Sequence, residues 1–300
     1  MSEPFGPELT SVRSPKVKAV RQLAKRALRL RARSFLAEGP QAVEAALTRG
    51  GVASQLFITA AARARHGDLA DQAARQGVPV QAVSGEVMAE LAQTITPQGV
   101  LAVCRYIDVP LARLAARGPR LVVILANVRD PGNAGTVLRT ADAAGADGVI
   151  FSDASVDPYN SKCVRATAGS LFHLPLVMDV PVAAAVSAMR EAGLHILAAD
   201  GRASRSLDET GPGGPGEPDS PLGGPTAWLF GNEAWGLPAG LLALADDAIA
   251  VPIYGQAESL NLAAAAAVCL YASARAARAG QASRAAPGPP APAGRVPREQ

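Results

Sequence analysis

The hydrophobic positions of the chain form short apolar runs that alternate with amphipathic stretches, as in an α/β protein. Near the N-terminus, an apolar piece at the start of SFLAEGPQAVEAALTRG precedes an amphipathic helix that ends at Gly50 and Gly51. Strand-like runs follow at 54–59, 78–83 and 99–106, and helical stretches lie between them at 69–75 and 86–92. This alternation predicts a small α/β sandwich domain over residues 35–110.

A second α/β domain is predicted over residues 118–279, after a linker with the sequence VPLARLAARGPR. Its predicted strands are 121–126, 148–151, 195–199, 227–230 and 248–251. A Gly/Pro-rich insertion at 211–225 is expected to be a mobile loop, and residues 280–300, with almost no apolar side chains, are expected to be a disordered tail.

Composition narrows the class of protein. A length of 300 residues suits two domains. The longest apolar runs are shorter than a membrane span needs, and the N-terminus lacks the apolar core of a signal peptide, so we expect a soluble cytoplasmic protein. Three cysteines (Cys104, Cys163 and Cys269) and three histidines (His66, His173 and His195) are scattered at no ligand spacing. We therefore expect reduced thiols and no metal site.

Residues 1–34 form a basic segment that is expected to be helical. From Arg13 to Arg33 the chain carries nine Lys or Arg residues and no acid. Arg21, Lys25, Arg29 and Arg33 recur every four residues, a spacing that predicts one helix face. Such a run of cations is either a solvated surface or a contact surface for nucleic-acid phosphates, and the absence of acids favours the second interpretation.

Three turns in the second domain combine glycine with polar side chains at the exit of a predicted strand. They lie in NVRDPGNAGTVLRTADAAG, WLFGNEAWGLP and IAVPIYGQAESLNLAAAA. The first turn has neither the G-x-G-x-x-G spacing of a dinucleotide site nor a G-K-[ST] phosphate loop. In an open α/β sheet, turns at the carboxyl ends of strands converge in one crevice, so we expect a site there.

The motifs DPGNAGTVLRTADAAG, FGNEAWG and VPIYGQAESLNLAAAAA resemble, in order and separation, the three motifs of the SpoU (TrmH-like) RNA ribose methyltransferases. The stretch KCVRATAGSLFHLP is also similar to the family. The first domain, from FLAEGPQAVEAAL through TPQGVLAV, resembles the family's small RNA-binding domain of the L30e type. The resemblance covers residues 35–277. The chain departs from the family at Ala126, where many members have an acid, and in its longer insertion at 211–225.

The resemblance implies an α/β fold in which an L30e-like domain precedes a SPOUT domain with a C-terminal trefoil knot. It also implies a homodimer that uses S-adenosylmethionine as its cofactor. The residues implied to bind the cofactor are Gly231, Val251, Ile253 and Leu260. The residues implied to be catalytic are Arg139, Asn133, Glu233, Ser259 and Asn261. RNA contacts are expected from Lys162 and Arg165, together with the basic segment.

Two roles are open for Arg139, which we expect beside the reacting ribose. It is either the base that activates the 2′-hydroxyl or a clamp for phosphate, since a guanidinium is a poor base. Glu233 is equally compatible with a catalytic role and with a structural one.

The implied activity is methyl transfer to a ribose 2′-hydroxyl. We expect 23S ribosomal RNA as the substrate, because the N-terminal domain resembles a ribosomal RNA-binding module. The alternatives are a transfer RNA 2′-O-methyltransferase, an inactive RNA-binding protein of the same fold, and a small-molecule methyltransferase, which the basic segment disfavours. Two questions stay open at the level of sequence: which nucleotide is methylated, and whether the methylation is a housekeeping modification or confers antibiotic resistance.

Overall fold

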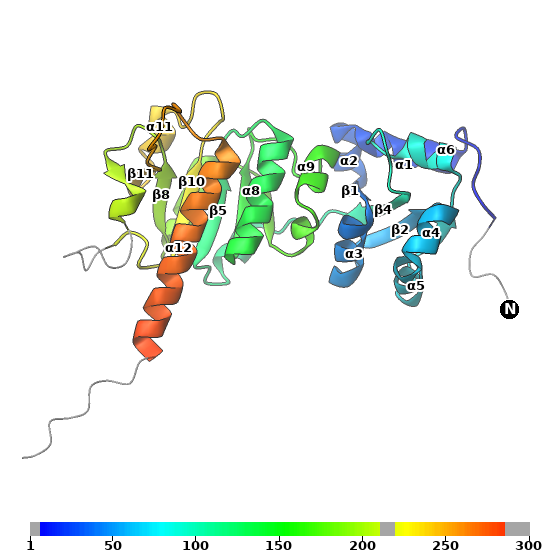
Figure 1. Ribbon diagram of the computed structural model, residues 1–300, viewed down its shortest axis with the longest axis horizontal. Helices are drawn as coiled ribbons and strands as arrows, with labels where there is room; N and C mark the ends of the chain where they lie inside the picture. The colour runs from blue at the N-terminus through cyan, green and yellow to red at the C-terminus, as the bar shows by residue number, and fades with distance from the viewer. Residues whose placement is uncertain (1–6, 211–219, 286–300) are drawn as a thin grey trace, which may run out of the picture.

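A computed structural model describes residues 7–210 and 220–285 of the chain. Two α/β domains lie side by side along the long axis of the molecule, with the N-terminal domain at one end and helix α12 (Leu262–Ala285) running down the other (Figure 1). The predicted α/β fold is therefore confirmed.

The N-terminal domain is built on a mixed sheet, which has four strands in the order β1-β4-β2-β3 within the described residues. The strands are β1 (Ser34–Glu38), β2 (Ala53–Ile58), β3 (Val80–Ala82) and β4 (Val100–Arg105). β4 runs antiparallel to β1 and β2, and β3 runs parallel to β2. Helices α3 (Pro40–Arg49), α4 (Ala60–Arg65) and α5 (Gly67–Arg75) bury apolar residues on one face, and α6 (Gly85–Leu91) covers the other. The predicted sandwich is present; helix α4 was not predicted.

The basic segment is not one helix, so the prediction of a shared cationic face is wrong. It forms α1 (Pro15–Arg21), a 3₁₀ turn η1 (Gln22–Ala24) and α2 (Arg26–Ala32). Lys25 lies between them with extended backbone, at φ −90° and ψ 126°. Val17, Val20 and Leu23 are buried against the sheet face that α6 covers. These apolar contacts make the segment part of the N-terminal domain rather than a separate arm.

The C-terminal domain contains a parallel sheet whose described strands number seven, in the order β7-β6-β5-β10-β8-β11-β9. The strands are β5 (Leu121–Leu125), β6 (Gly148–Ser152), β7 (Leu176–Val180), β8 (His195–Ala199), β9 (Arg205–Ser206), β10 (Thr226–Phe230) and β11 (Asp247–Ala250). The five predicted strands are present, and β7 and β9 are additional. Most strands are apolar throughout because both faces of the sheet are covered by helices.

Alternate side chains along each strand enter different cores. Val123 and Leu125 pack in a core shared with α8 (Pro131–Ala144), α9 (Ser161–Ala166) and α12. Val122 and Ile124 pack in a second core with α7 (Leu111–Ala115), α10 (Val182–Glu191) and α11 (Ala239–Leu242). Short 3₁₀ turns, η2 (Ser170–Phe172) and η3 (Leu207–Glu209), complete the domain.

Three predicted boundaries need correction. The linker contains helix α7, because Leu114 is buried in the second core. In the Gly/Pro-rich insertion, Leu222 is buried, so the end of the insertion is held in the structure; residues 211–219 lie outside the described part. Helix α12 continues through Ala285, so the predicted tail begins too early at 280, and residues 286–300 lie outside the described part.

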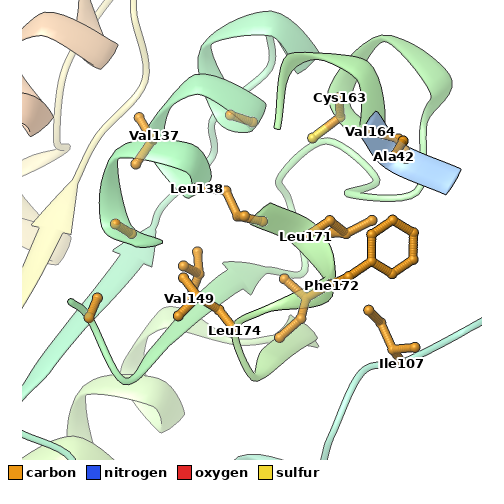
Figure 2. Packing of buried hydrophobic residues seen from close by; sticks show 14 of the residues in the cluster. Ala42, Ile107, Val137, Leu138, Val149, Cys163, Val164, Leu171, Phe172 and Leu174 are labelled. Atoms are coloured by element: carbon orange, nitrogen blue, oxygen red, sulfur yellow. The ribbon is translucent and has the colours of Figure 1, made fainter. Parts of the chain in front are cut away.

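The two domains share one apolar core. Figure 2 shows Leu171 and Phe172 of η2 near Ala42 of α3, with Ile107 on the chain that joins the domains. Phe35 of β1 stacks on Phe172 with ring centroids 5.9 Å apart, and lies 4.6 Å from the ring of Tyr159. This continuous packing fixes the N-terminal domain against α9 and η2.

Candidate active site

The carboxyl ends of β5, β10, β8 and β11 are adjacent because these strands are neighbours in a parallel sheet. The turns that follow three of them surround a cavity of about 720 Å³. It is lined by residues after β8 (Asp200 to Arg202), after β10 (Gly231 to Gly236) and after β11 (Val251, Ile253 and Glu258 to Leu262). A crevice outside the carboxyl ends of strands is where open α/β sheets bind ligands.

Most of the residues predicted to be catalytic or to bind the cofactor lie at this cavity. Those that line it are Gly231, Glu233, Val251, Ile253, Ser259, Leu260 and Asn261. Ile253 and Leu260 present apolar side chains that are 38% and 39% exposed. Lining residues that were not among the predicted site residues include Asp200, Arg202, Trp235 and Glu258. Asp200 and Arg202 could have been found from the sequence, because they follow the predicted strand 195–199 as polar residues follow the strands at the other turns.

Gly231 is required by its own loop. A Cβ atom at this position would lie 2.4 Å from the carbonyl carbon of Gly236 and 2.7 Å from the backbone nitrogen of Leu237. Asn232 and Gly236 exchange two backbone hydrogen bonds, of 3.0 and 2.9 Å, and Gly236 has a φ of +69°. The Asn232 side chain also donates to the carbonyl of Asn127 at 2.8 Å. The glycine therefore allows the loop after β10 to close tightly against the turn after β5.

A chain of amides and one carboxylate joins the turns. Asn261 Nδ2 donates to Asn133 Oδ1 at 3.1 Å, and Asn133 Nδ2 donates to Glu233 Oε1 at 3.2 Å. Glu233 also accepts from the backbone nitrogens of Arg129 and Asp130, at 3.4 and 3.3 Å. The structure thus favours the structural interpretation of Glu233, which holds the first turn beside the other two.

Arg139 does not lie at the cavity, although the sequence predicted it beside the reacting ribose. Its side chain is exposed on α8, it does not line the cavity, and within the described residues it has no hydrogen-bond or ion-pair partner. The helix begins at Pro131, and at 1.5 Å per residue Arg139 lies about 12 Å further along its axis. Within one chain, Arg139 therefore lies away from the cavity, and its position beside the reacting ribose stays a prediction.

The two cations of α9 differ in their surroundings. Lys162 pairs with Asp130 at 2.9 Å, and this hydrogen bond, together with one from the backbone of Asn133, holds the pKa of Asp130 below its ordinary value. Lys162 is thus beside the first turn of the site. Arg165 instead pairs with Glu38 of the N-terminal domain at 3.4 Å. Arg129, which was not predicted, is exposed next to Glu233 and has no side-chain partner among the described residues.

Four cations of the basic segment were predicted to contact RNA, and three of them instead form ion pairs within the protein. Arg29 is only 3% exposed and binds Asp157 of the C-terminal domain through Nε at 3.0 Å and Nη2 at 2.5 Å. Its Nη1 donates to the carbonyls of Leu23 and Ala24. A surface role for Arg29 in RNA binding is therefore wrong.

The other cations predicted to contact RNA, Arg21, Lys25 and Arg33, are exposed. Arg33 binds Asp108 through Nη2, at 2.9 Å from each carboxylate oxygen, and Arg21 pairs with Glu90. Lys25 has no partner in the described part of the chain. Of the four predicted cations, Lys25 is therefore the one presented to solvent without an acid beside it.

The remaining expectations concern metals, membranes and thiols. Cys104, Cys163 and Cys269 are free and buried, and burial raises the pKa of Cys269 to about 12, so these thiols stay protonated. The described residues contain no cluster of three or more His, Cys, Asp or Glu side chains suited to a metal ion. Among the described helices, none combines the length and the hydrophobicity of a membrane span.

Comparison with known proteins agrees with this arrangement. Residues 120–271 match the SpoU rRNA Methylase family, and residues 14–102 match the MRM3-like substrate binding domain. The chain is 34% identical over 265 residues to the 23S rRNA (guanosine(2553)-2′-O)-methyltransferase RlmP of Bacillus subtilis, covering 88% of this chain and 98% of that protein.

Two solved structures are similar over most of the chain. An AdoMet-bound rRNA methyltransferase from Sinorhizobium meliloti has a TM-score of 0.77 and 32% identity, covering 91% of this chain and 98% of its own. The SpoU methyltransferase AviRb from Streptomyces viridochromogenes, in complex with AdoMet, has a TM-score of 0.74 and 30% identity, covering 89% of this chain and 100% of its own. The motifs, the fold and the sequence identity agree, and this chain belongs to the SpoU rRNA methylase family.

Proposed function

We propose that the protein transfers a methyl group from S-adenosylmethionine to a ribose 2′-hydroxyl in 23S ribosomal RNA. The observation that carries this proposal is the cavity at the strand ends, where apolar residues and a hydrogen-bonded set of Asn133, Glu233 and Asn261 meet. The relative from Bacillus subtilis is named for this reaction on 23S rRNA, and two similar structures contain AdoMet.

The residues of the cavity fit this cofactor. Its volume, about 720 Å³, lies in the range of small-molecule sites. Val251, Ile253 and Leu260 offer apolar walls on which an adenine can lie. The carboxylate of Glu258 offsets the positive charges of the cofactor's ammonium and sulfonium groups, whereas Asp200 is paired with Arg202. When bound, the cofactor supplies an electrophilic methyl group.

The protein's own residues orient the ribose. Glu233, Asn133 and Asn261 form one hydrogen-bonded chain, which fixes the amide of Asn261 in the lining of the cavity. Such pre-organisation aligns the 2′-oxygen with the methyl group without further ordering. We assign Arg139 to the clamp role, because a guanidinium stays protonated and binds phosphate in a forked geometry.

Arg139 reaches a reacting ribose only in a different copy of the chain, and we therefore propose a homodimer. Its exposure and lack of partners on α8 support a role outside its own cavity. Val268 and Tyr271 on α12, the helix packed beside α8, are large apolar residues at the surface, as expected of an interface. The threading of the C-terminal segment into a trefoil knot is proposed on the resemblance to the family alone.

RNA would approach over α9 and the N-terminal domain. Arg129 and Lys162 lie beside the first turn, and Lys25 and Arg31 extend the cationic surface on the N-terminal segment. Residues 14–102 match a substrate binding domain, and the relative from Bacillus subtilis is named for a reaction on 23S rRNA, which supports a ribosomal substrate. We place the reaction in the cytoplasm, where ribosomal RNA is found and where the three free thiols remain reduced.

Two measurements test the function. Mapping of 2′-O-methyl groups in 23S ribosomal RNA from a deletion strain should reveal one position that loses its methylation and regains it on complementation. Calorimetry should show that the purified protein binds S-adenosylmethionine, and that Gly231→Ala binds it far less, because the added Cβ opens the loop after β10. A protein that binds RNA but not the cofactor would be an inactive member of the family.

A further inference from the structure

Trp235 is an exposed aromatic residue at the edge of the cofactor cavity. Its side chain is 57% exposed, whereas Trp228, the other tryptophan, is 0% exposed. It lies on the loop after β10, which is closed by the two backbone hydrogen bonds between Asn232 and Gly236. Ala234 N also donates to the Asn232 side chain at 2.8 Å. The backbone that carries the indole is therefore fixed, while the indole itself faces solvent.

A second hollow, of about 520 Å³, also has Trp235 in its lining. It shares Trp235, Asp200 and Arg202 with the cofactor cavity, so the two spaces are adjacent. The rest of its lining is apolar: Ala203, Leu237, Pro238, Ala239, Leu242 and Ala248. The hollow therefore combines an indole, an aliphatic floor and the ion pair of Arg202 with Asp200.

The cation is held in a defined orientation. Arg202 Nε donates to Asp200 Oδ1 at 3.0 Å, and Nη2 donates to Asp200 Oδ2 at 2.9 Å. The Arg202 side chain remains 72% exposed, so the guanidinium keeps a free edge toward solvent at the rim of both hollows. A planar cation beside an aromatic ring suits a ligand that has both a flat π-face and a negative charge.

We propose that Trp235 is a stacking platform for an unstacked nucleobase of the RNA substrate, next to the ribose that is methylated. This inference rests on the proposed function, because it takes RNA as the ligand. A base would lie on the indole with its edge over the aliphatic floor, and its phosphate would contact Arg202. Aromatic residues bind any base in this way, because every base has a π-face.

The test compares Trp235→Phe, which keeps an aromatic ring, with Trp235→Leu, which keeps only apolar bulk. Methylation kinetics are measured on ribosomal RNA from a strain that lacks the protein. Trp235→Leu should raise the KM for RNA roughly ten- to a hundredfold, and Trp235→Phe should stay within about threefold of wild type. Because Trp235 also lines the cofactor cavity, calorimetry of S-adenosylmethionine binding accompanies both variants, and the kinetics are measured at a saturating concentration of the cofactor. Tyr254→Leu is the matched control, since Tyr254 is an exposed aromatic residue that lines neither hollow.

Fluorescence gives a readout that does not depend on methyl transfer. Single-stranded RNA of about 12 nucleotides should quench the tryptophan emission of wild-type protein, and the quenching should vanish in Trp235→Phe, where only the buried Trp228 remains. If wild type quenches in this way but methylates no RNA, the proposed function fails while the stacking site stands. Equal quenching in both proteins, or a normal KM for RNA in Trp235→Leu, would overturn the stacking site. A changed molecular mass of Trp235→Leu in solution would assign the face to a second copy and would also overturn it.

Discussion

The N-terminal segment and the turns at the strand ends are both rich in polar side chains. In the segment most of the predicted cations are paired within the protein, whereas the turns leave some polar and aromatic side chains exposed to solvent. In the segment, the Arg29 side chain points inward and donates hydrogen bonds to Asp157 and to two backbone carbonyls. At the turns, Glu233 binds two backbone nitrogens and the side chain of Asn133, while Arg129 and Trp235 remain at the surface. The comparison teaches that a cluster of charges identifies a binding surface only after its internal partners have been assigned.

The buried pair of Arg29 and Asp157 gives the largest expected effect on stability. Arg29→Leu should lower the free energy of unfolding by about 3–5 kcal/mol, because it leaves Asp157 buried without its partner. Urea denaturation measures this loss. The matched control is Arg31→Leu, two residues along α2, where the side chain is exposed and the change should stay within about 0.5 kcal/mol. Equal losses in the two variants would mean that Arg29 contributes nothing to domain docking.

Arg139 gives the next largest effect, on catalysis rather than on stability. Arg139→Ala should lower the rate of methyl transfer by about 10²–10³-fold, the cost of removing one fixed donor at a reacting centre. Cofactor binding and thermal stability should be unchanged, since the side chain is exposed and lies outside its own cavity. Arg139→Lys should recover little, because an ammonium lacks the planar fork.

Mixed dimers sharpen the Arg139 prediction. Arg139→Ala and Gly231→Ala are each expected to be inactive as homodimers, and co-expression should restore activity by forming one intact site. Single-turnover kinetics on the separated heterodimer provide the measurement. Two inactive homodimers that yield an inactive heterodimer would contradict the sharing of Arg139 between copies.

The salt dependence of RNA binding tests the surface of the N-terminal segment. Neutralising Arg21, Lys25 and Arg33 together should flatten the slope of log K against log salt by at most about three, at roughly 0.7–0.9 per phosphate contact. Lys25→Gln alone should account for close to one contact, since Lys25 lacks an acid beside it in the described structure. A slope that all these variants leave unchanged would show that RNA does not touch the segment.

The smallest effect concerns Asp130 at the start of α8. Lys162 keeps the pKa of this carboxyl below its ordinary value of 3.8, so the folded state holds its proton less tightly than the unfolded chain. The stabilisation is complete above that value and is lost as the pH falls through the lower folded pKa. Because the pair is exposed, it is worth less than about 1 kcal/mol. Urea unfolding between about pH 6 and pH 3 should show a smaller pH dependence in Asp130→Asn than in wild type.

The sequence predicted the strands and turns of the site because both have local signatures. Runs such as LVVIL are apolar on both faces of a covered sheet, and glycine with Asn marks the turns that follow. β7 was missed because its run is short, follows Pro175 and ends in polar and irregular backbone, with Asp179 at a φ of 56°.

The errors have a different origin, since they depend on contacts far apart in sequence. The burial of Arg29 depends on Asp157, 128 residues away, and no spacing within the segment reveals it. The position of Arg139 outside the cavity follows from the direction in which α8 leaves the sheet. Periodicity reports which residues share a face, whereas the partner of that face is set by the tertiary fold.

The most direct test of the account is a methyl-transfer reaction with purified protein, S-adenosylmethionine labelled in its methyl group, and 23S ribosomal RNA from a strain that lacks the protein. The account predicts that label appears at a ribose 2′-oxygen of one nucleotide, and that Arg139→Ala binds the cofactor but transfers almost none of it. Label on a base, or transfer by Arg139→Ala at the wild-type rate, would contradict the assignment of this cavity and this arginine to ribose methylation.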